Sequence, residues 1–194
     1  MNADMYPESA MRLIIIGIAA GCVLLCGACA PMAEPRTLDS ASEQSLSAIV
    51  RESLVGGVGD VIGIVQFRES PYGLMIVPNL HGLEPGPHAL HVHENPDCGP
   101  SADGNPAGAA GGHYDPLGSS VHSGPYQEGH LGDLPNLIVE ADGTARMATL
   151  APRPTLADVK GRALMLHAGA DKYEFYAEHQ HGTGGPRMYC GVIR

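Results

Sequence analysis

The chain has 194 residues, of which 16% are charged and none is tryptophan, and it contains 26 glycines and 16 prolines. This length predicts one main domain, and the composition suits short strands joined by many turns better than a helical bundle. The formal net charge of −10 argues against nucleic acid or an anionic membrane surface as a partner, because both require basic patches, and an anionic substrate would need a local positive feature.

The first 30 residues have the character of an export signal. Met11-Arg12, followed by the apolar run that begins at Leu13, is a better signal-peptide start than the polar and acidic first ten residues. Met11 is therefore a candidate for the true first residue. We predict a signal peptide over residues 1–30 and export of the remainder to the periplasm or cell envelope.

Three fates of this leader fit its residues. Gly27-Ala28-Cys29 resembles a bacterial lipoprotein box, in which Cys29 is lipidated and becomes the first mature residue, although Cys26 stands where a larger aliphatic residue is usual. Ordinary signal peptidase could instead cut after Ala30, although Pro31 follows directly. The uncharged run up to Ala30 could also remain as a membrane anchor. We favour lipidation at Cys29.

Residues 31–46 are rich in Pro, Ser and Glu without apolar periodicity, which predicts a flexible tether and leaves residues 47–194 as the domain. In this domain, eight short apolar segments lie between turn signals, and this pattern predicts an all-β antiparallel sandwich or barrel. One helical turn is expected over Thr155–Arg162. The expected strands are Ser47–Ser53, Val61–Glu69, Leu74–Leu80, His88–Glu94, Asn136–Glu140, Thr144–Leu150, Ala163–Ala168 and Arg187–Ile193.

Five of the ten histidines lie between His91 and Asp133. His91 and His93 are two apart in an apolar strand, so both side chains point to one face. By itself, this pair could be a half-buried strand pair, and His122 could be a solvated loop residue. The density of the cluster favours a metal site instead. Imidazoles with one carboxylate suit copper or zinc rather than calcium or magnesium. The cluster comprises His91, His93, His113, His122, His130 and Asp133.

Five motifs, in this order, resemble the copper,zinc superoxide dismutase family in its bacterial periplasmic branch, over roughly residues 47–194. The resemblance implies an eight-stranded antiparallel Greek-key sandwich or barrel with two long loops, a zinc and disulfide loop and an electrostatic loop. It also implies dismutation of superoxide to dioxygen and hydrogen peroxide by alternate reduction and reoxidation of copper, with zinc structural. The motifs are His-Val-His-Glu-Asn-Pro, Gly-Gly-His-Tyr-Asp-Pro, Gly-His-Leu-Gly-Asp-Leu-Pro, Leu-Met-Leu-His and Cys-Gly-Val-Ile.

The resemblance assigns ligands position by position. His113 would bridge the two ions and accept a proton when it leaves copper. Copper can change its oxidation state in this arrangement, whereas zinc cannot. The implied copper ligands are His91, His93, His113 and His167, and the implied zinc ligands are His113, His122, His130 and Asp133.

Two further residues take roles from the resemblance. Asp171, which alone would read as an exposed loop residue, matches a carboxylate that links a copper-ligand histidine to a zinc-ligand histidine. Arg187 matches the arginine that guides the anion to copper. No Lys or Arg lies between Arg68 and Arg146, so Lys172 and Arg187 are the only cations near the channel in sequence. We therefore expect superoxide capture to rely on Arg187.

Cys98 and Cys190 are the two cysteines outside the leader. In an exported protein they are most simply a disulfide, and the resemblance also pairs them; two free buried thiols are the alternative. His88 matches a histidine with a packing role. His179 and His181 read as solvated loop residues, with accessory copper capture as the alternative.

The main alternative function is a non-catalytic periplasmic copper/zinc-binding module on the same fold. Such relatives commonly lack a copper ligand or the arginine, and this chain keeps all of them. A copper-only dismutase would lack the zinc residues, and a purely structural sandwich would leave the histidine spacing unexplained. The predicted partners are superoxide as substrate and a membrane only through a lipid at Cys29, with no nucleic acid, and the chain is expected to be a monomer or a homodimer.

Overall fold

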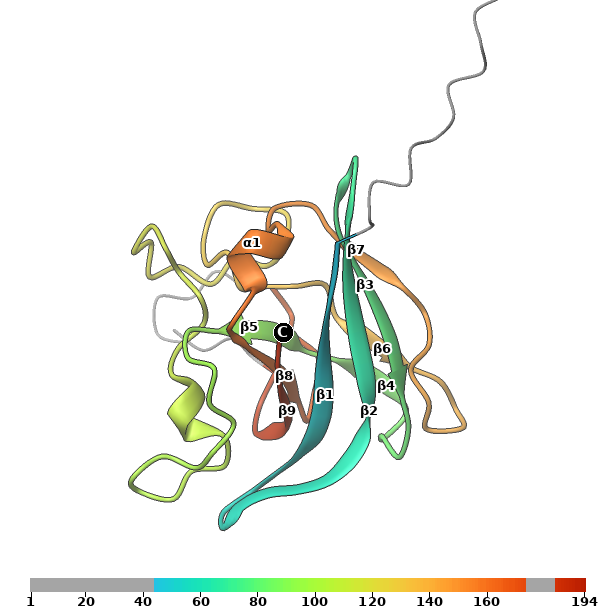
Figure 1. Cartoon of the computed structure of the whole chain (residues 1–194), viewed down its shortest axis with the longest axis vertical. Helices are drawn as coiled ribbons and strands as arrows, with labels where there is room; N and C mark the ends of the chain where they lie inside the picture. Colours follow the sequence, from blue (N-terminus) through green and yellow to red (C-terminus); the bar gives the residue numbers. More distant parts are fainter. Residues whose placement is uncertain (1–43, 174–183) are drawn as a thin grey trace, which may run out of the picture. The chain divides into compact units, whose positions relative to one another are not determined.

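The structure is a computed structural model, and it describes residues 44–173 and 184–194. The described residues form nine strands, a one-turn helix α1 (Leu156–Val159) and a 3-10 turn η1 (Gly108–Ala110) (Figure 1). The predicted leader and most of the predicted tether lie outside the described residues. The strands are β1 (Ser45–Leu54), β2 (Gly57–Ser70), β3 (Gly73–Leu80), β4 (Gly86–His88), β5 (Leu90–His93), β6 (Leu137–Val139), β7 (Thr149–Ala151), β8 (Ala163–His167) and β9 (Arg187–Val192).

Seven strands form one curled antiparallel sheet in the order β5-β8-β9-β1-β2-β3-β7, and β4 pairs with β6 in a second sheet (Figure 1). The first three strands follow one another as a meander. By contrast, β5, β8 and β9 reach the other side of β1 through long connections, which is Greek-key connectivity. The predicted all-β antiparallel Greek-key architecture is confirmed.

Alternating burial along the strands explains how the barrel closes on a core. In β1, Ala48 and Val50 are 0% and 2% exposed, whereas Ile49 between them is 55% exposed. This period of two is what a sheet with one buried face requires. The inward residues of both ends of the sheet meet in one apolar cluster, whose largest members include Phe67, Leu74, Ile76, Leu90, Leu164, Leu166 and Ile193.

The strand count differs from the prediction because the expected strand His88–Glu94 is divided. Its first part, β4, pairs with β6, and its second part, β5, pairs with β8 in the other sheet. The chain changes sheets at Ala89, which is fully buried and still forms backbone hydrogen bonds to Gly169 and His167. The apolar run is continuous through this change, so the periodicity alone does not mark it.

The expected helical turn is present but shorter, as α1. Thr155 caps it, and Asp158 completes a capping box by accepting hydrogen bonds from the Thr155 backbone and hydroxyl. Within the described part of the chain, none of the helical segments has the length and apolar character needed to span a membrane.

Two long connections carry most of the polar residues of interest, one between β5 and β6 and one between β8 and β9. A disulfide between Cys98 in the first connection and Cys190 in β9 ties the first connection to the barrel, with a Cα–Cα distance of 5.6 Å. The bond spans 92 residues of sequence. Closing a loop of that length stabilises a fold by roughly 4 to 5 kcal/mol in the chain-entropy treatment.

Candidate metal centre

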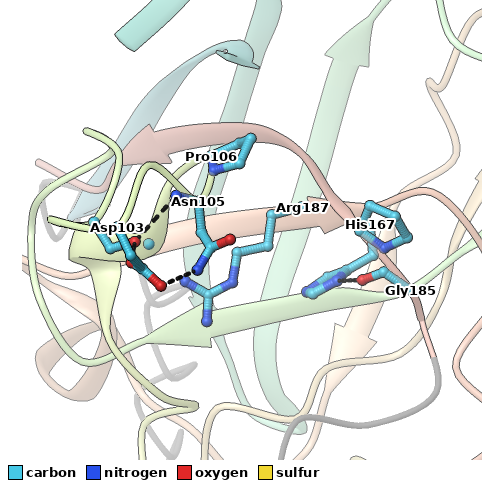
Figure 2. Close-up of a pocket in the computed structure, with 9 residues that line it drawn as sticks. Asp103, Asn105, Pro106, His167, Gly185 and Arg187 are labelled. Atoms are coloured by element: carbon cyan, nitrogen blue, oxygen red, sulfur yellow. Dashed lines mark hydrogen bonds between the residues drawn. The ribbon is translucent and has the colours of Figure 1, made fainter. Parts of the chain in front are cut away.

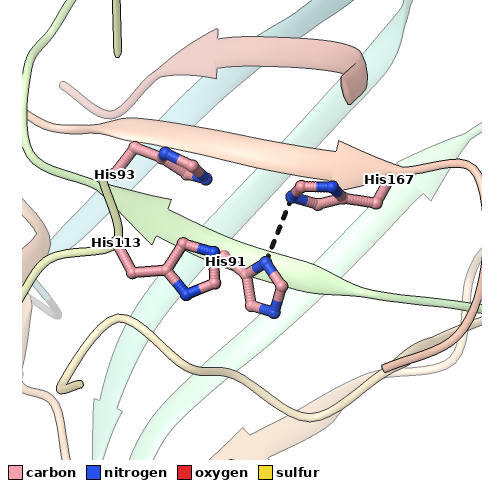
Figure 3. Close-up of side chains that lie close together, drawn as sticks. All are labelled: His91, His93, His113 and His167. Atoms are coloured by element: carbon pink, nitrogen blue, oxygen red, sulfur yellow. Dashed lines mark hydrogen bonds between the residues drawn. The ribbon is translucent and has the colours of Figure 1, made fainter. Parts of the chain in front are cut away.

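Four histidines converge beside β5 and β8 (Figure 3). His91 and His93 project from the same side of β5, while Leu90 and Val92 point into the barrel core. His167 ends β8, the neighbouring strand, and His113 reaches the group through a bridge to His93. Each of these four residues offers a ligand atom, and these atoms lie within 4.8 Å of one another. All four residues are buried.

The hydrogen bonds around three of these rings fix their tautomers. His91 Nε2 lies 2.9 Å from Asp171 Oδ2, His93 Nδ1 lies 3.0 Å from the Gly111 carbonyl, and His167 Nδ1 lies 2.8 Å from the Gly185 carbonyl. Because a carboxylate or carbonyl oxygen only accepts, each of these nitrogens must carry the proton. The other nitrogen of each ring therefore has a lone pair directed away from these acceptors.

Those lone pairs meet in a way that calls for a cation. His91 Nδ1 and His167 Nε2 lie 3.1 Å apart, although neither has a proton to share, and His93 Nε2 is buried without a hydrogen-bond partner. Burial holds the pKa of His91 and His93 well below the ordinary value and lowers the pKa of His167 to about 4. The rings are therefore neutral at neutral pH. A metal ion that accepts the lone pairs would satisfy all three nitrogens.

A second group forms around Asp133, which is 1% exposed. His113 Nδ1 lies 2.8 Å from Asp133 Oδ1, and His122 Nδ1 lies 3.0 Å from Oδ2. His130 borders the group, with its Nδ1 3.5 Å from Asp133 Oδ1. Burial alone would raise the pKa of Asp133, but the His113 hydrogen bond and the close contacts of His122 and His130 outweigh burial and hold that pKa well below its usual range. The ligand atoms of His91, His113, His122 and Asp133 lie within 4.8 Å of one another.

Asp171 connects the two groups. Its Oδ2 lies 2.9 Å from His91 Nε2 and 2.7 Å from His122 Nε2. Burial lowers the pKa of His122, but the close contacts of its two ring nitrogens with the carboxylates of Asp133 and Asp171 outweigh burial and raise it to about 9. The same contacts hold the pKa of Asp171 well below its ordinary value, against the effect of burial. This carboxylate therefore orients one ring in each group.

The structure reveals supporting residues that the sequence reasoning missed. Asn136 forms a reciprocal pair of hydrogen bonds with the backbone of Asp171, both of 2.9 Å. Arg153 donates to the carbonyls of Gly129 and His130 at 2.8 and 3.1 Å. These contacts join residues far apart in the chain, so the only sequence signal is a polar residue close to a strand, which is too common to be diagnostic.

A second set of contacts fixes the backbone next to the ligands. The Arg162 guanidinium stacks 3.4 Å above the Tyr114 ring, and its Nη1 donates to the carbonyl of Glu94. Gly132 is required beside them, since a Cβ there would lie 2.2 Å from the carbonyl oxygen of Val92. The segment that contains Asp133 can therefore lie directly against β5.

Arg187 stands at an open pocket next to the first group (Figure 2). The pocket has a volume of about 570 Å³, and its lining includes His167, Gly185 and Arg187. Two backbone carbonyls hold the guanidinium, Ala107 at 2.8 Å and Gly111 at 2.7 Å. Both belong to the connection that the disulfide ties to β9. A small anion that enters the pocket thus meets a fixed cation next to a histidine of the first group.

The remaining predicted residues have distinct positions. His88 is buried, with Nδ1 2.8 Å from the His167 carbonyl and Nε2 2.7 Å from the Glu84 carbonyl, which agrees with a packing role. Lys172 is exposed next to Asp171. His179 and His181 lie outside the described residues.

The fold and the site together define a class: a Greek-key β-barrel with two adjoining metal sites, one formed by four imidazoles and the other built on a carboxylate. Comparison with known proteins agrees. The family model for copper/zinc superoxide dismutase (SODC) matches residues 61–193. The chain is 44% identical over 188 residues to superoxide dismutase [Cu-Zn] 1 of Salmonella typhimurium, covering 94% of this chain and 99% of that protein.

Solved structures give the same result. The Cu/Zn superoxide dismutase from Brucella abortus has a TM-score of 0.73 and 45% identity, covering 78% of this chain and all of that one. The monomeric copper, zinc superoxide dismutase from Salmonella enterica has a TM-score of 0.65 and 41% identity, with the same coverage. The chain belongs to the copper/zinc superoxide dismutase family.

Proposed function

We propose that this protein removes superoxide, converting two superoxide ions and two protons to dioxygen and hydrogen peroxide. One observation carries the proposal: two ligand groups adjoin each other and share His91 and His113, and the first of them borders a pocket that contains a fixed guanidinium. Family membership supports the same activity. Metal-replete protein should dismutate superoxide, lose this activity on chelation, and regain it with copper and zinc added together.

The residues fit the two metals by their chemistry. His91, His93 and His167 present neutral imidazole nitrogens that suit copper, and Asp133 with His122 and His130 forms the mixed nitrogen and oxygen set that suits zinc. His113 belongs to both ligand groups and would be shared by the two ions. When bound, copper supplies the one-electron acceptor and donor for superoxide.

The chain's own groups have separate roles in this reaction. Arg187 binds and orients the anion in the pocket through charge-assisted hydrogen bonds. His113 Nε2 is the atom at which a proton would be held and returned. Asp171 fixes the ring orientations of His91 and His122, and the Cys98–Cys190 disulfide holds the connection whose carbonyls grip Arg187.

The alternative of a non-catalytic copper/zinc-binding module is less well supported. A storage site needs no open pocket with an oriented guanidinium. The position of the Arg187 guanidinium beside His167 would then have no role in the function of the protein. Copper and zinc binding without a superoxide dismutase rate above that of the metal-free protein would favour the module.

We also propose that the protein is exported and tethered to the cell envelope through a lipid on Cys29. The apolar run after Met11-Arg12 and the Gly27-Ala28-Cys29 segment support this proposal. Mass spectrometry of the mature amino terminus should find a lipidated residue 29, and a Cys29→Ser variant should be released from the envelope. The superoxide dismutase from Salmonella enterica is monomeric, and this favours a monomer over a homodimer for this protein.

A further inference from the structure

The pocket that contains Arg187 also carries a negative charge at its rim. Of the described residues that line it, Arg187 is the one cationic side chain and Asp103 the one anionic side chain, since His167 is neutral (Figure 2). The pocket entrance therefore has no net charge from these two side chains. For an entering anion, the attraction by one charge is opposed by the other.

Asp103 is held at this position by its own loop. Its carboxylate accepts hydrogen bonds from the Ser101 hydroxyl and from Asn105 Nδ2, the latter at 2.8 Å, and Ser101 and Asn105 also line the pocket. The hydrogen bond from Ser101, followed by the backbone of Asp103 itself, lowers the pKa of this exposed carboxyl. Asp103 is therefore ionised throughout the neutral range.

The same loop also supplies the carbonyls that hold Arg187, at Ala107 and Gly111. One loop thus places the cation that attracts superoxide and, a few residues earlier, a carboxylate that repels it. The segment between Arg68 and Arg146 contains no Lys or Arg that could offset this charge. Asp103 has no hydrogen bond to the metal-site histidines among the described contacts, so its effect on the reaction would be electrostatic.

We infer that Asp103 slows the capture of superoxide at the pocket entrance and makes the rate less sensitive to salt than Arg187 alone would make it. This inference rests on the proposed dismutase activity. It identifies Asp103 as a residue that sets the rate of capture without touching the reacting atoms.

The test compares charge variants of the fully metallated protein. Asp103→Asn keeps the shape and an acceptor for Ser101, and it should raise the second-order rate constant about twofold at low ionic strength. Asp103→Lys should raise it about fourfold. Both gains should disappear near 1 M salt, where the screening length is only about 3 Å.

Two matched controls separate charge at the pocket from other effects. Asp142→Asn removes another exposed carboxylate, one that accepts hydrogen bonds from Thr144 and does not line the pocket, and it should leave the rate unchanged. Asp103→Glu keeps the charge and alters the loop, and it should behave like the wild type. Copper and zinc contents are measured for every variant, and rates are expressed per copper.

The outcomes are distinct. An unchanged or lower rate for Asp103→Asn at low salt, an equal gain for Asp142→Asn, or an equal gain for Asp103→Glu would each overturn the inference. Absence of dismutase activity in the wild-type protein would instead refute the proposed function, so the two failures cannot be confused.

Discussion

The two halves of the metal centre differ in what holds them. His91, His93 and His167 lie on β5 and β8, which pair with each other at the edge of the main sheet. His122 and His130 lie on the long connection between β5 and β6, and the contacts of Asp133, Asp171 and Arg153 hold them in place. The strand half (His91, His93 and His167) takes its geometry from the paired backbones of β5 and β8. The loop half (His122, His130 and Asp133) takes its geometry from side-chain contacts.

The halves also differ in ionisation. Burial lowers the pKa of His91, His93 and His167, so the strand half presents neutral nitrogens. In the loop half, carboxylates raise the pKa of His122 to about 9, so this ring is protonated at neutral pH in the metal-free protein and must release a proton to bind an ion. The strand half thus presents nitrogens that can bind metal without losing a proton, whereas His122 in the loop half must first release one.

The largest expected contrast comes from deleting one imidazole in each half. His93→Ala should lose copper while retaining zinc, and its dismutase rate should fall by at least about a thousandfold. His130→Ala should lose zinc first, with the rate per bound copper staying within about tenfold of the wild type. Metal analysis with rate measurement tests both. Equal loss of both metals in both variants would show that the halves do not behave separately.

The ionisation difference predicts a stability maximum near pH 6.5 for the metal-free protein. The folded-state pKa of His122 lies above the ordinary 6.5, so its stabilisation is present below pH 6.5 and lost as the pH rises to about 9. The folded-state pKa of His167 lies below 6.5, so the unfolded chain is protonated first and stability is lost as the pH falls from 6.5 to about 4.

Each of these losses should amount to about 2 to 3 kcal/mol of unfolding free energy, measured by urea denaturation of the metal-free protein. His122→Gln should abolish the alkaline loss and preserve the acid one, which attributes each arm to its half. A profile that is flat from pH 6.5 to 9 would contradict the protonated state assigned to His122.

Asp171 contacts one histidine in each half, and Asp171→Asn should weaken metal binding in the two halves unequally. Zinc affinity should fall by about 10- to 100-fold, because His122 loses the negative charge that faces its ring and the loop has no strand to hold it. Copper affinity should fall less, because the β5 and β8 pairing still positions His91 and His167. Competition titrations with a chelator measure both affinities. A larger loss for copper than for zinc would reverse the assignment of roles.

The same difference explains which features could be predicted from the sequence. The strand half was open to prediction because residues two apart on a strand share a face, so His91 and His93 had to point the same way. The strand pattern also predicted the antiparallel architecture. The division at Ala89 could not be predicted, because pairing with two different sheets leaves no trace in an apolar run.

In the loop half, only the residues that belong to recognisable motifs could be predicted. Spacing and resemblance named His122, His130 and Asp133 as candidates, and the structure brings His122 and Asp133 into one ligand group, with His130 at its border. The supports Asn136 and Arg153 act on backbone groups of residues far away in sequence, so no local pattern points to them. The role of Asp103 was likewise missed. An exposed aspartate in a turn has no distinctive sequence pattern, and only the fold places it in the same pocket as Arg187.

Two arginines with the same kind of contact offer the final test of the comparison. Arg187 donates hydrogen bonds to two backbone carbonyls beside the strand half, and Arg153 donates hydrogen bonds to two backbone carbonyls in the loop half. Arg187→Ala should lower the superoxide rate constant about tenfold at low salt with both metals retained, since it removes the cation at the pocket. Arg187→Lys should recover part of the loss.

Arg153→Met is the counterpart, and its first effect should be faster zinc loss to a chelator, because the backbone at Gly129 and His130 is released. Stopped-flow decay of superoxide at several salt concentrations, with metal analysis of the same samples, measures both variants. An Arg187→Ala protein with the wild-type rate at low salt would mean that superoxide reaches the centre without this guanidinium. The pocket beside His167 would then not be the route by which superoxide reaches the strand half.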